Sequence, residues 1–137
     1  MGRPIAPADG IAFAFPNVCL TPVPSAPSVP VPYPNIAQLG DAQDVSDESD
    51  RQLLVGGTPI LLVGSTVASS NGDEPGTDGG VTSGSNGGEC EMIQGSGTVL
   101  YGPDGLGIVR FGDPTSQNDG NATGTVLSAN PSVLVGD

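Results

Sequence analysis

Glycine and proline recur so often along this chain that they decide what it can fold into. The sequence holds 22 Gly and 14 Pro among its 137 residues, and almost no stretch of twelve residues lacks both. Inside a helix, a Gly costs roughly 1 kcal/mol and a Pro roughly 3 kcal/mol relative to Ala. Clusters of Val, Leu and Ile lie between these residues, and a disordered chain would lack them. The sequence therefore predicts an all-β fold of short strands joined by tight turns.

The charge of the chain excludes several classes of partner. Fifteen acidic residues stand against three arginines and no lysine, which leaves a net charge of −12. So few cations cannot neutralise the phosphates of a nucleic acid or hold the chain on an anionic membrane. No apolar run approaches the roughly 18 residues of a membrane-spanning helix, and the N-terminal residues lack the pattern of a secretion signal. We expect cytoplasmic assembly and, if the protein leaves the cell, export by another machine.

The sequence lacks two of the residue types that often act as bases in enzymes. There is no histidine and no lysine, so a serine nucleophile has no base to activate it. A glycosidase would use two carboxylates in a cleft lined by aromatic side chains. The chain has three Phe, two Tyr and no Trp with which to line such a cleft. We predict that the protein is not an enzyme and has neither catalytic nor cofactor-binding residues.

Cys19 and Cys90 are the only thiols, and they are the only candidates for metal ligands. They can pair as a disulfide, supply two ligands of a metal site, or act as small buried hydrophobic residues. The third role is favoured. The acidic run Ser70–Gly80 resembles a calcium loop, but it lacks the spacing and the distal Glu of such a loop. Turn formation explains its composition better, so no metal site is predicted.

Two parts of the chain resemble each other. Leu54-Val55 precedes a Gly-Gly turn and Leu100-Tyr101 precedes a Gly-Pro-Asp-Gly turn, which are strong hairpin signals. The apolar runs Ile60–Gly64 and Ile108–Gly112 follow these turns. Repeats of this size bury a hydrophobic face by packing on one another. We predict a single domain over residues 1–137, built of three hairpin units related by a pseudo-three-fold axis, with the first unit matching loosely.

Two further stretches stand out. The polar, acidic segment Gly40–Asp50 is predicted to be a surface loop. The proline-rich run Thr21–Pro34 has two interpretations, because proline holds the backbone extended. It can be a polyproline ligand for an aromatic groove of a partner, or a stiff edge segment laid across the domain with Val and Tyr facing inward. The second interpretation is favoured.

Three motifs in order resemble those of PAAR-like domain proteins, over about residues 10–135. They are Ala14–Pro22 with Val31–Ala37, then Asn71–Gly80, and finally Gly112–Thr115 with Asn118 and Asn121. The positions expected to have a structural role are Pro16, Cys19, Pro22, Pro32, Tyr33, Pro34, Asn35, Gly72, Asp73, Gly76, Gly79, Gly80, Gly112, Asp113, Asn118 and Asn121.

The resemblance implies a small conical β-domain that caps the homotrimeric spike protein of a type VI secretion system or related contractile injection machine. Such a cap sharpens the spike, has a membrane only as its puncture target, can recruit effector proteins and is delivered outside the cell with the particle. Related proteins hold zinc near the apex with histidines and a cysteine. This sequence has no histidine, so that site is not carried over and zinc is not expected. The alternative function is an adhesin or tail-fibre module that binds a surface ligand.

Overall fold

The prediction of an all-β fold is confirmed. The computed structural model describes residues 2–46, 53–102 and 104–137, in which strands are joined by turns and one 3-10 turn, η1. The bounds are β1 Arg3–Ile5, β2 Ile11–Val23, β3 Ala26–Gln38, η1 Leu39–Asp41, β4 Leu54–Val55, β5 Thr58–Pro59, β6 Thr66–Val67, β7 Cys90–Met92, β8 Leu100–Tyr101, β9 Leu106–Gly107, β10 Pro114–Gln117, β11 Ala122–Val126 and β12 Asn130–Val135. No helix in these residues is long and apolar enough to cross a bilayer.

One sheet of six strands forms the body of the molecule. Its order is β3-β2-β11-β10-β7-β6, and every neighbouring pair is antiparallel. The two ends of the sheet also meet. Ile36 in β3 exchanges two backbone hydrogen bonds of 2.8 Å with Asn71, just after β6, and Gln43 bonds Thr66 in the same way. The sheet therefore closes into a ring around the core.

A pseudo-three-fold axis is visible in the backbone hydrogen bonds. The amide of Leu61 donates to the carbonyl of Ala6 at 3.0 Å, that of Val109 donates to Leu61 at 3.0 Å, and that of Ala6 donates to Val109 at 3.1 Å. These three bonds form a closed cycle in which each residue has the same role. Three similar chain segments therefore surround one axis, as the repeats predicted.

A short hairpin leads into each of the three segments. Two of them, β4–β5 and β8–β9, are the hairpins that the turn sequences predict. The third pairs β1 with β12, so it is made from the two ends of the chain. The first unit was expected to match loosely through its proline-rich segment. Its short hairpin, β1–β12, instead pairs its strands as the other two hairpins do, but these two strands lie more than 120 residues apart in the sequence.

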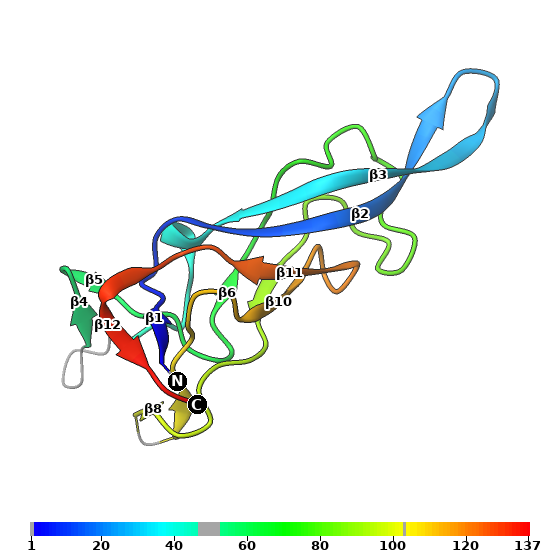
Figure 1. Cartoon of the computed structure of the whole chain (residues 1–137). Coiled ribbons are helices and arrows are strands. Elements are labelled where there is room, and N and C mark those ends of the chain that lie inside the picture. Colours follow the sequence, from blue (N-terminus) through cyan, green and yellow to red (C-terminus); the bar gives the residue numbers. More distant parts are fainter. Residues whose placement is uncertain (1, 47–52, 103) are drawn as a thin grey trace.

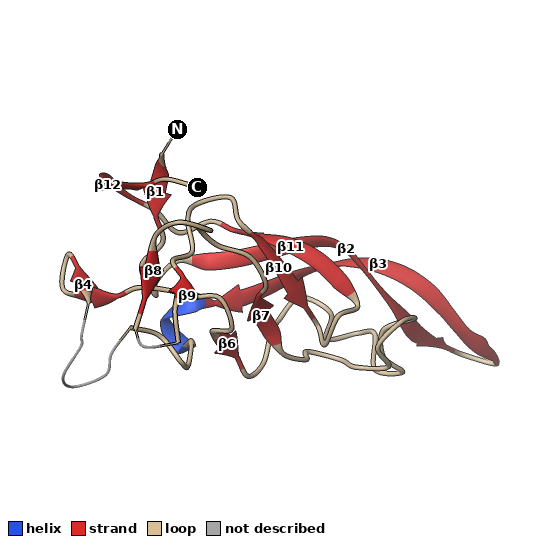
Figure 2. Ribbon diagram, turned by 90° about the horizontal axis from the view of Figure 1, so that it is seen from below, coloured by secondary structure: helices blue, strands red, loops and turns tan. Residues whose placement is uncertain are grey.

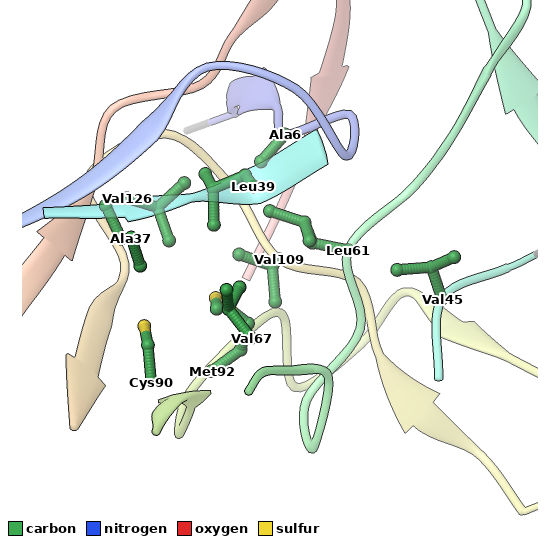
Figure 3. Close-up of a cluster of buried hydrophobic side chains, with 11 residues drawn as sticks. Ala6, Ala37, Leu39, Val45, Leu61, Val67, Cys90, Met92, Val109 and Val126 are labelled. Carbon is green, nitrogen blue, oxygen red and sulfur yellow. The ribbon is translucent and has the colours of Figure 1, made fainter. Parts of the chain in front are cut away.

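The core is stacked in layers of three equivalent residues, with the largest set nearest the short hairpins and the smallest set at the other end of the axis. Figure 3 shows most of the central layers. From the end with the short hairpins, the layers are Ile5, Ile60 and Ile108, then Ala6, Leu61 and Val109, then Leu39, Met92 and Val126, then Ala37, Cys90 and Gly124. The volume available to side chains thus falls from three isoleucines to an alanine, a cysteine and a glycine.

The molecule tapers as these layers do. Figures 1 and 2 show a broad end that carries both termini and the three short hairpins, and a narrow end from which the β2–β3 hairpin extends. We call these ends the base and the apex. The proline-rich run Thr21–Pro34 forms the outer part of this hairpin and is paired in a strand ladder, not in a polyproline helix.

Two expectations about surface segments need correction. The proline-rich run is an edge segment, but it projects from the body, and Val29 is 42% exposed where an inward-facing side chain was expected. The acidic segment Gly40–Asp50 was expected to be a surface loop. Val45 and Ser46 within it are buried, because Ser46 bonds the backbone of Leu53 and Ile60. Residues 47–50 lie outside the described residues.

Candidate functional site

The apex is filled by a network of buried polar side chains where the apolar layers end. The amide of Asn17 donates to Asp73 Oδ2 at 2.9 Å. Its oxygen accepts from Asn118 at 3.1 Å and from Asn121 at 2.6 Å. The three predicted motifs each contribute to this network, although they are about 50 residues apart in the chain. Amide side chains both donate and accept, so a small set of them can satisfy one another without charge.

Cys19 lies inside this apex network. Its sulfur is 3.7 Å from Asn17 Oδ1 and 3.8 Å from Asp73 Oδ2 and from Asn118 Nδ2. Burial raises the pKa of the Cys19 thiol, and the negative charge of Asp73 raises it further. The thiol therefore stays protonated at neutral pH and acts as a weak hydrogen-bond donor.

Cys90 has a different environment. It is fully buried in the hydrophobic core beside Val67 and Met92 (Figure 3), and burial raises its pKa to about 12. Neither cysteine is in a disulfide. The two belong to separate clusters, so they do not combine as ligands, and the interpretation of Cys90 as a small hydrophobic residue fits its surroundings.

The apex donor set does not fit the zinc that the fold family implies. Zinc in proteins takes four ligands from Cys, His and carboxylate groups. Within residues 2–46, 53–102 and 104–137, the group of this kind in contact with Cys19 is Asp73, whose Oδ2 already accepts hydrogen bonds from Asn17 and Gly87. The other oxygen of Asp73 is buried without a hydrogen-bond partner among the described residues. One thiol and one carboxylate supply two of four ligands, and the remaining neighbours are amides.

Glycines of the central motif allow its loop to lie against the β2–β3 hairpin. A Cβ added at Gly72 would lie 2.4 Å from the carbonyl oxygen of Pro34, and one at Gly76 would lie 2.5 Å from Cys19 Cβ. Gly80 is equally close to Asn121. Gly79, at a φ of +91°, faces the backbone of Gly84. These glycines are therefore required by close approach, not by chemistry at a reactive centre.

The other motif residues also have structural contacts. The amide of Asn35 donates to Ser70 at 2.9 Å, and the oxygen of Asn35 accepts from Gln117 at 2.9 Å. The hydroxyl of Tyr33 is 2.6 Å from that of Thr21. Gly112 has a φ of +88°. The prolines of the motifs, Pro16, Pro22, Pro32 and Pro34, are exposed along the hairpin.

Ion pairs fasten both chain ends at the base. Asp113 is fully buried and bonds both Arg3 and Arg110. Arg110 also donates to the Gly136 carbonyl at 3.2 Å and to the Asp137 carboxylate at 3.0 Å. The hydrogen bond from Arg110 lowers the pKa of the Asp137 side chain. These contacts tie the β1–β12 hairpin to the third chain segment.

Three leucines occupy equivalent exposed positions on the base hairpins. Leu54 pairs with Pro59, Leu100 with Gly107 and Leu134 with Pro4, each on the outer strand of its hairpin. Their exposed fractions are 43%, 54% and 63%. We call this set the leucine triad. Sequence reasoning missed it, although a signal was present: Leu-Leu-Val-Gly at 53–56, Val-Leu-Tyr-Gly at 99–102 and Val-Leu-Val-Gly at 133–136 share one pattern.

Comparison with known proteins agrees with this architecture. A scan against protein-family models matches the toxin PAAR-like domain over residues 10–124. No curated protein and no solved structure matches the chain. The family match contains the three motifs and the whole apex network, but it leaves out β1 and β12, the split base hairpin. Because the match covers far more than half of the 137 residues, the chain belongs to the toxin PAAR-like domain family, whose members are structural or toxin-associated modules.

Proposed function

We propose that this protein is a non-enzymatic cap whose base binds the homotrimeric spike protein of a contractile injection system, with one cap per trimer. The leucine triad is the observation that carries the proposal. A homotrimer presents three identical surfaces at its end, and a single chain can contact all three alike only if it carries three near-equivalent surfaces of its own. The base of this monomer has that property at Leu54, Leu100 and Leu134.

The chemistry of the base supports binding to a protein. Three leucines that are each about half exposed gain roughly 1 kcal/mol apiece when a partner removes the remaining surface from water. The short hairpins bring the outer strands β4, β8 and β12 to the base, where their main-chain groups can extend strands of the trimer. Contacts of both kinds would be repeated three times around one axis.

The apex fits the second part of the proposed role, which is to lead the particle through a membrane. The apex is narrow, and a closed amide network and close-approach glycines hold it together. A stiff, tapered end suits a part that is driven through a membrane. In this proposal the cap is assembled in the cytoplasm, leaves the cell with the particle, and has effector proteins as further partners. Type VI secretion and phage tail-like machines both fall within it.

A mixing experiment with the cognate spike tests the proposal. Native mass spectrometry of cap and trimer should give a mass of one cap with three spike chains. Leu54→Asp, Leu100→Asp and Leu134→Asp should each weaken binding about tenfold or more, because each places a carboxylate in an apolar contact.

Leu127→Asp is the matched control. Leu127 is 43% exposed, as Leu54 is, but it follows β11 and its amide bonds Ile11 of the body sheet and not a base hairpin, so affinity should stay unchanged. Another stoichiometry, or an equal loss of affinity in all four variants, would contradict the proposal. A cap that ignores the trimer and binds a cell-surface glycan instead would favour an adhesin or tail-fibre module.

A further inference from the structure

The outer part of the β2–β3 hairpin stands clear of the body. Cys19 and Asn35 are the last fully buried residues on its two strands, and none of residues 20–34 between them is buried. Figures 1 and 2 show this part extending beyond the loops at the apex. We call residues 20–34 the arch. It is the part of the molecule furthest from the leucine triad.

The arch has no charge in a chain that is otherwise highly acidic. Residues 10–40 contain no Asp, Glu, Lys or Arg, so all fifteen acidic residues lie elsewhere. The tip, 21–29, consists of Thr, Pro, Val, Ser and Ala. The nearest charged group with a recorded contact is Asp78, whose carboxylate accepts a hydrogen bond from Ser28 within the tip. Residues 23–27, beyond that contact, are neutral and largely apolar.

Proline removes three outward-facing backbone donors from the arch. Pro30 lies opposite Leu20, whose own N–H points away from β3 and donates to the Gly79 carbonyl at 2.8 Å. The backbone nitrogen of Pro30 therefore also faces outward. Because this orientation repeats every second residue, the nitrogens of Pro32 in β3 and of Pro22 in β2 face outward as well. Each of these positions would otherwise present an unpaired N–H group.

Charged side chains are a common protection for an exposed strand edge, and this acidic chain uses none of them here. Protection against strand pairing alone would allow a charge at these positions. A lipid environment would not, because it penalises both charges and unpaired backbone donors. The absence of charged residues and the loss of three outward N–H groups to proline together indicate a surface suited to lipid.

We infer that the arch partitions into the interface of a neutral lipid bilayer. From Pro22, beside the Ser28 contact with Asp78, to Pro24 the strand rises about 7 Å, which reaches the interfacial region of one leaflet but does not cross a hydrocarbon core about 30 Å thick. Asp78 would remain at the level of the head groups. The remaining charge of the protein, −12, keeps its body in water and opposes binding to anionic lipid. The inference goes beyond the proposed function, because it requires no spike protein.

Tryptophan reporters test the inference, because the natural chain has no Trp. Ala26 is exposed at the tip of the arch and Ala129 is exposed just before β12 at the base. With phosphatidylcholine vesicles, the emission of Ala26→Trp should shift to shorter wavelength as the indole enters the interface. The emission of Ala129→Trp should not change. No shift for Ala26→Trp, or an equal shift for both variants, would overturn the inference.

A charge placed at the same two positions gives a second test. In vesicle flotation at a fixed lipid concentration, Ala26→Asp should lower the partition coefficient about tenfold or more relative to the natural chain. Ala129→Asp should leave it unchanged, and circular dichroism should show both variants folded. Equal behaviour of the two Asp variants, or binding that appears only with anionic lipid, would overturn the inference. Spike binding is read separately, so either proposal can fail without the other.

Discussion

Amide side chains take the place of hydrocarbon where the core narrows toward the apex. Asn17, Asn35, Gln117 and Asn118 are all fully buried. A buried amide is costly unless its donors and acceptors find partners. Here the partners are other amides, the Asp73 carboxylate, hydroxyl groups and backbone groups of neighbouring loops, so each side chain holds two segments together. Rigidity at the narrow end therefore depends on a few polar residues.

Asn118 is the residue whose loss should disturb this apex network most. It donates to Asn17 Oδ1 and to the carbonyl of Ser85 and accepts from the amide of Gly88. Asn118→Ala removes the partner of the Ser85 carbonyl and of the Gly88 amide and one of the two amide donors to Asn17 Oδ1, so we expect the free energy of unfolding to fall by about 2–4 kcal/mol. The φ of +50° at this position adds to the cost, because Asn adopts this left-handed conformation more readily than Ala does.

Urea denaturation followed by circular dichroism measures this change. Gln94→Ala is the control, because Gln94 is exposed and should give a difference within about 0.5 kcal/mol. If the two variants were equally stable, the apex network would not contribute to stability as proposed.

Each strand hairpin of the body contributes one small residue to the narrowest apolar layer. The β10–β11 hairpin contributes Gly124, in register with Thr115. A Cβ on Gly124 would lie 2.1 Å from Gln117 Oε1, 2.6 Å from the Phe13 carbonyl and 2.8 Å from Thr115 Oγ1. The backbone carbonyl cannot move without disturbing the pairing of β11 with β2. The size of this residue is therefore fixed by the geometry of the ring.

Gly124→Ala should consequently be severely destabilising. We expect a loss of about 3 kcal/mol, at the upper end of the usual cost of overpacking, because a backbone atom is among the close contacts. Gly40→Ala should have almost no effect, because nothing lies within 4 Å of a Cβ built there. Thermal unfolding of the two variants measures the difference. An equally small effect of both substitutions would show that the ring expands easily.

Prediction from the sequence succeeded where the signal was local. The Gly-Gly and Gly-Pro-Asp-Gly turns fix the β4–β5 and β8–β9 hairpins through a few adjacent residues. The β1–β12 hairpin depends on contact between residues 4 and 134, and no local rule joins them. The apex network was also hidden, because Asn in a Gly-rich run indicates a turn whether or not its side chain is later buried. Burial depends on packing of the whole chain.

At the scale of the molecule, the base carries three equivalent hairpins, and in one of them, β1–β12, the turn is replaced by the two chain ends. The chain ends could therefore be moved to the turn of either other hairpin. We expect a circular permutant to fold when Asp137 is joined to Met1 by a short Gly/Ser linker and the chain is opened between Gly56 and Gly57. In this permutant β4 and β5 would pair from the two ends of the chain, as β12 and β1 do in the natural chain.

The permutant should unfold within about 1 kcal/mol of the natural chain and keep its circular dichroism spectrum. The contrasting permutant is opened between Ala12 and Phe13, inside β2 where Ala12 is fully buried. It should lose cooperative unfolding, because its new ends fall in the core of the sheet. If the Gly56–Gly57 permutant failed to fold while the Ala12–Phe13 permutant survived, the three hairpins would not be equivalent.

The split hairpin also sets an order in time on the ribosome. Strands β4, β5, β8 and β9 can pair as soon as they emerge, but β1 has no partner until residues 130–135 have been synthesised. A product that stops after residue 127 would contain every motif of the family and the entire apex, yet it would lack β12 and, with it, Leu134 of the leucine triad. The leucine triad is therefore complete only after residues 130–135 have joined the fold.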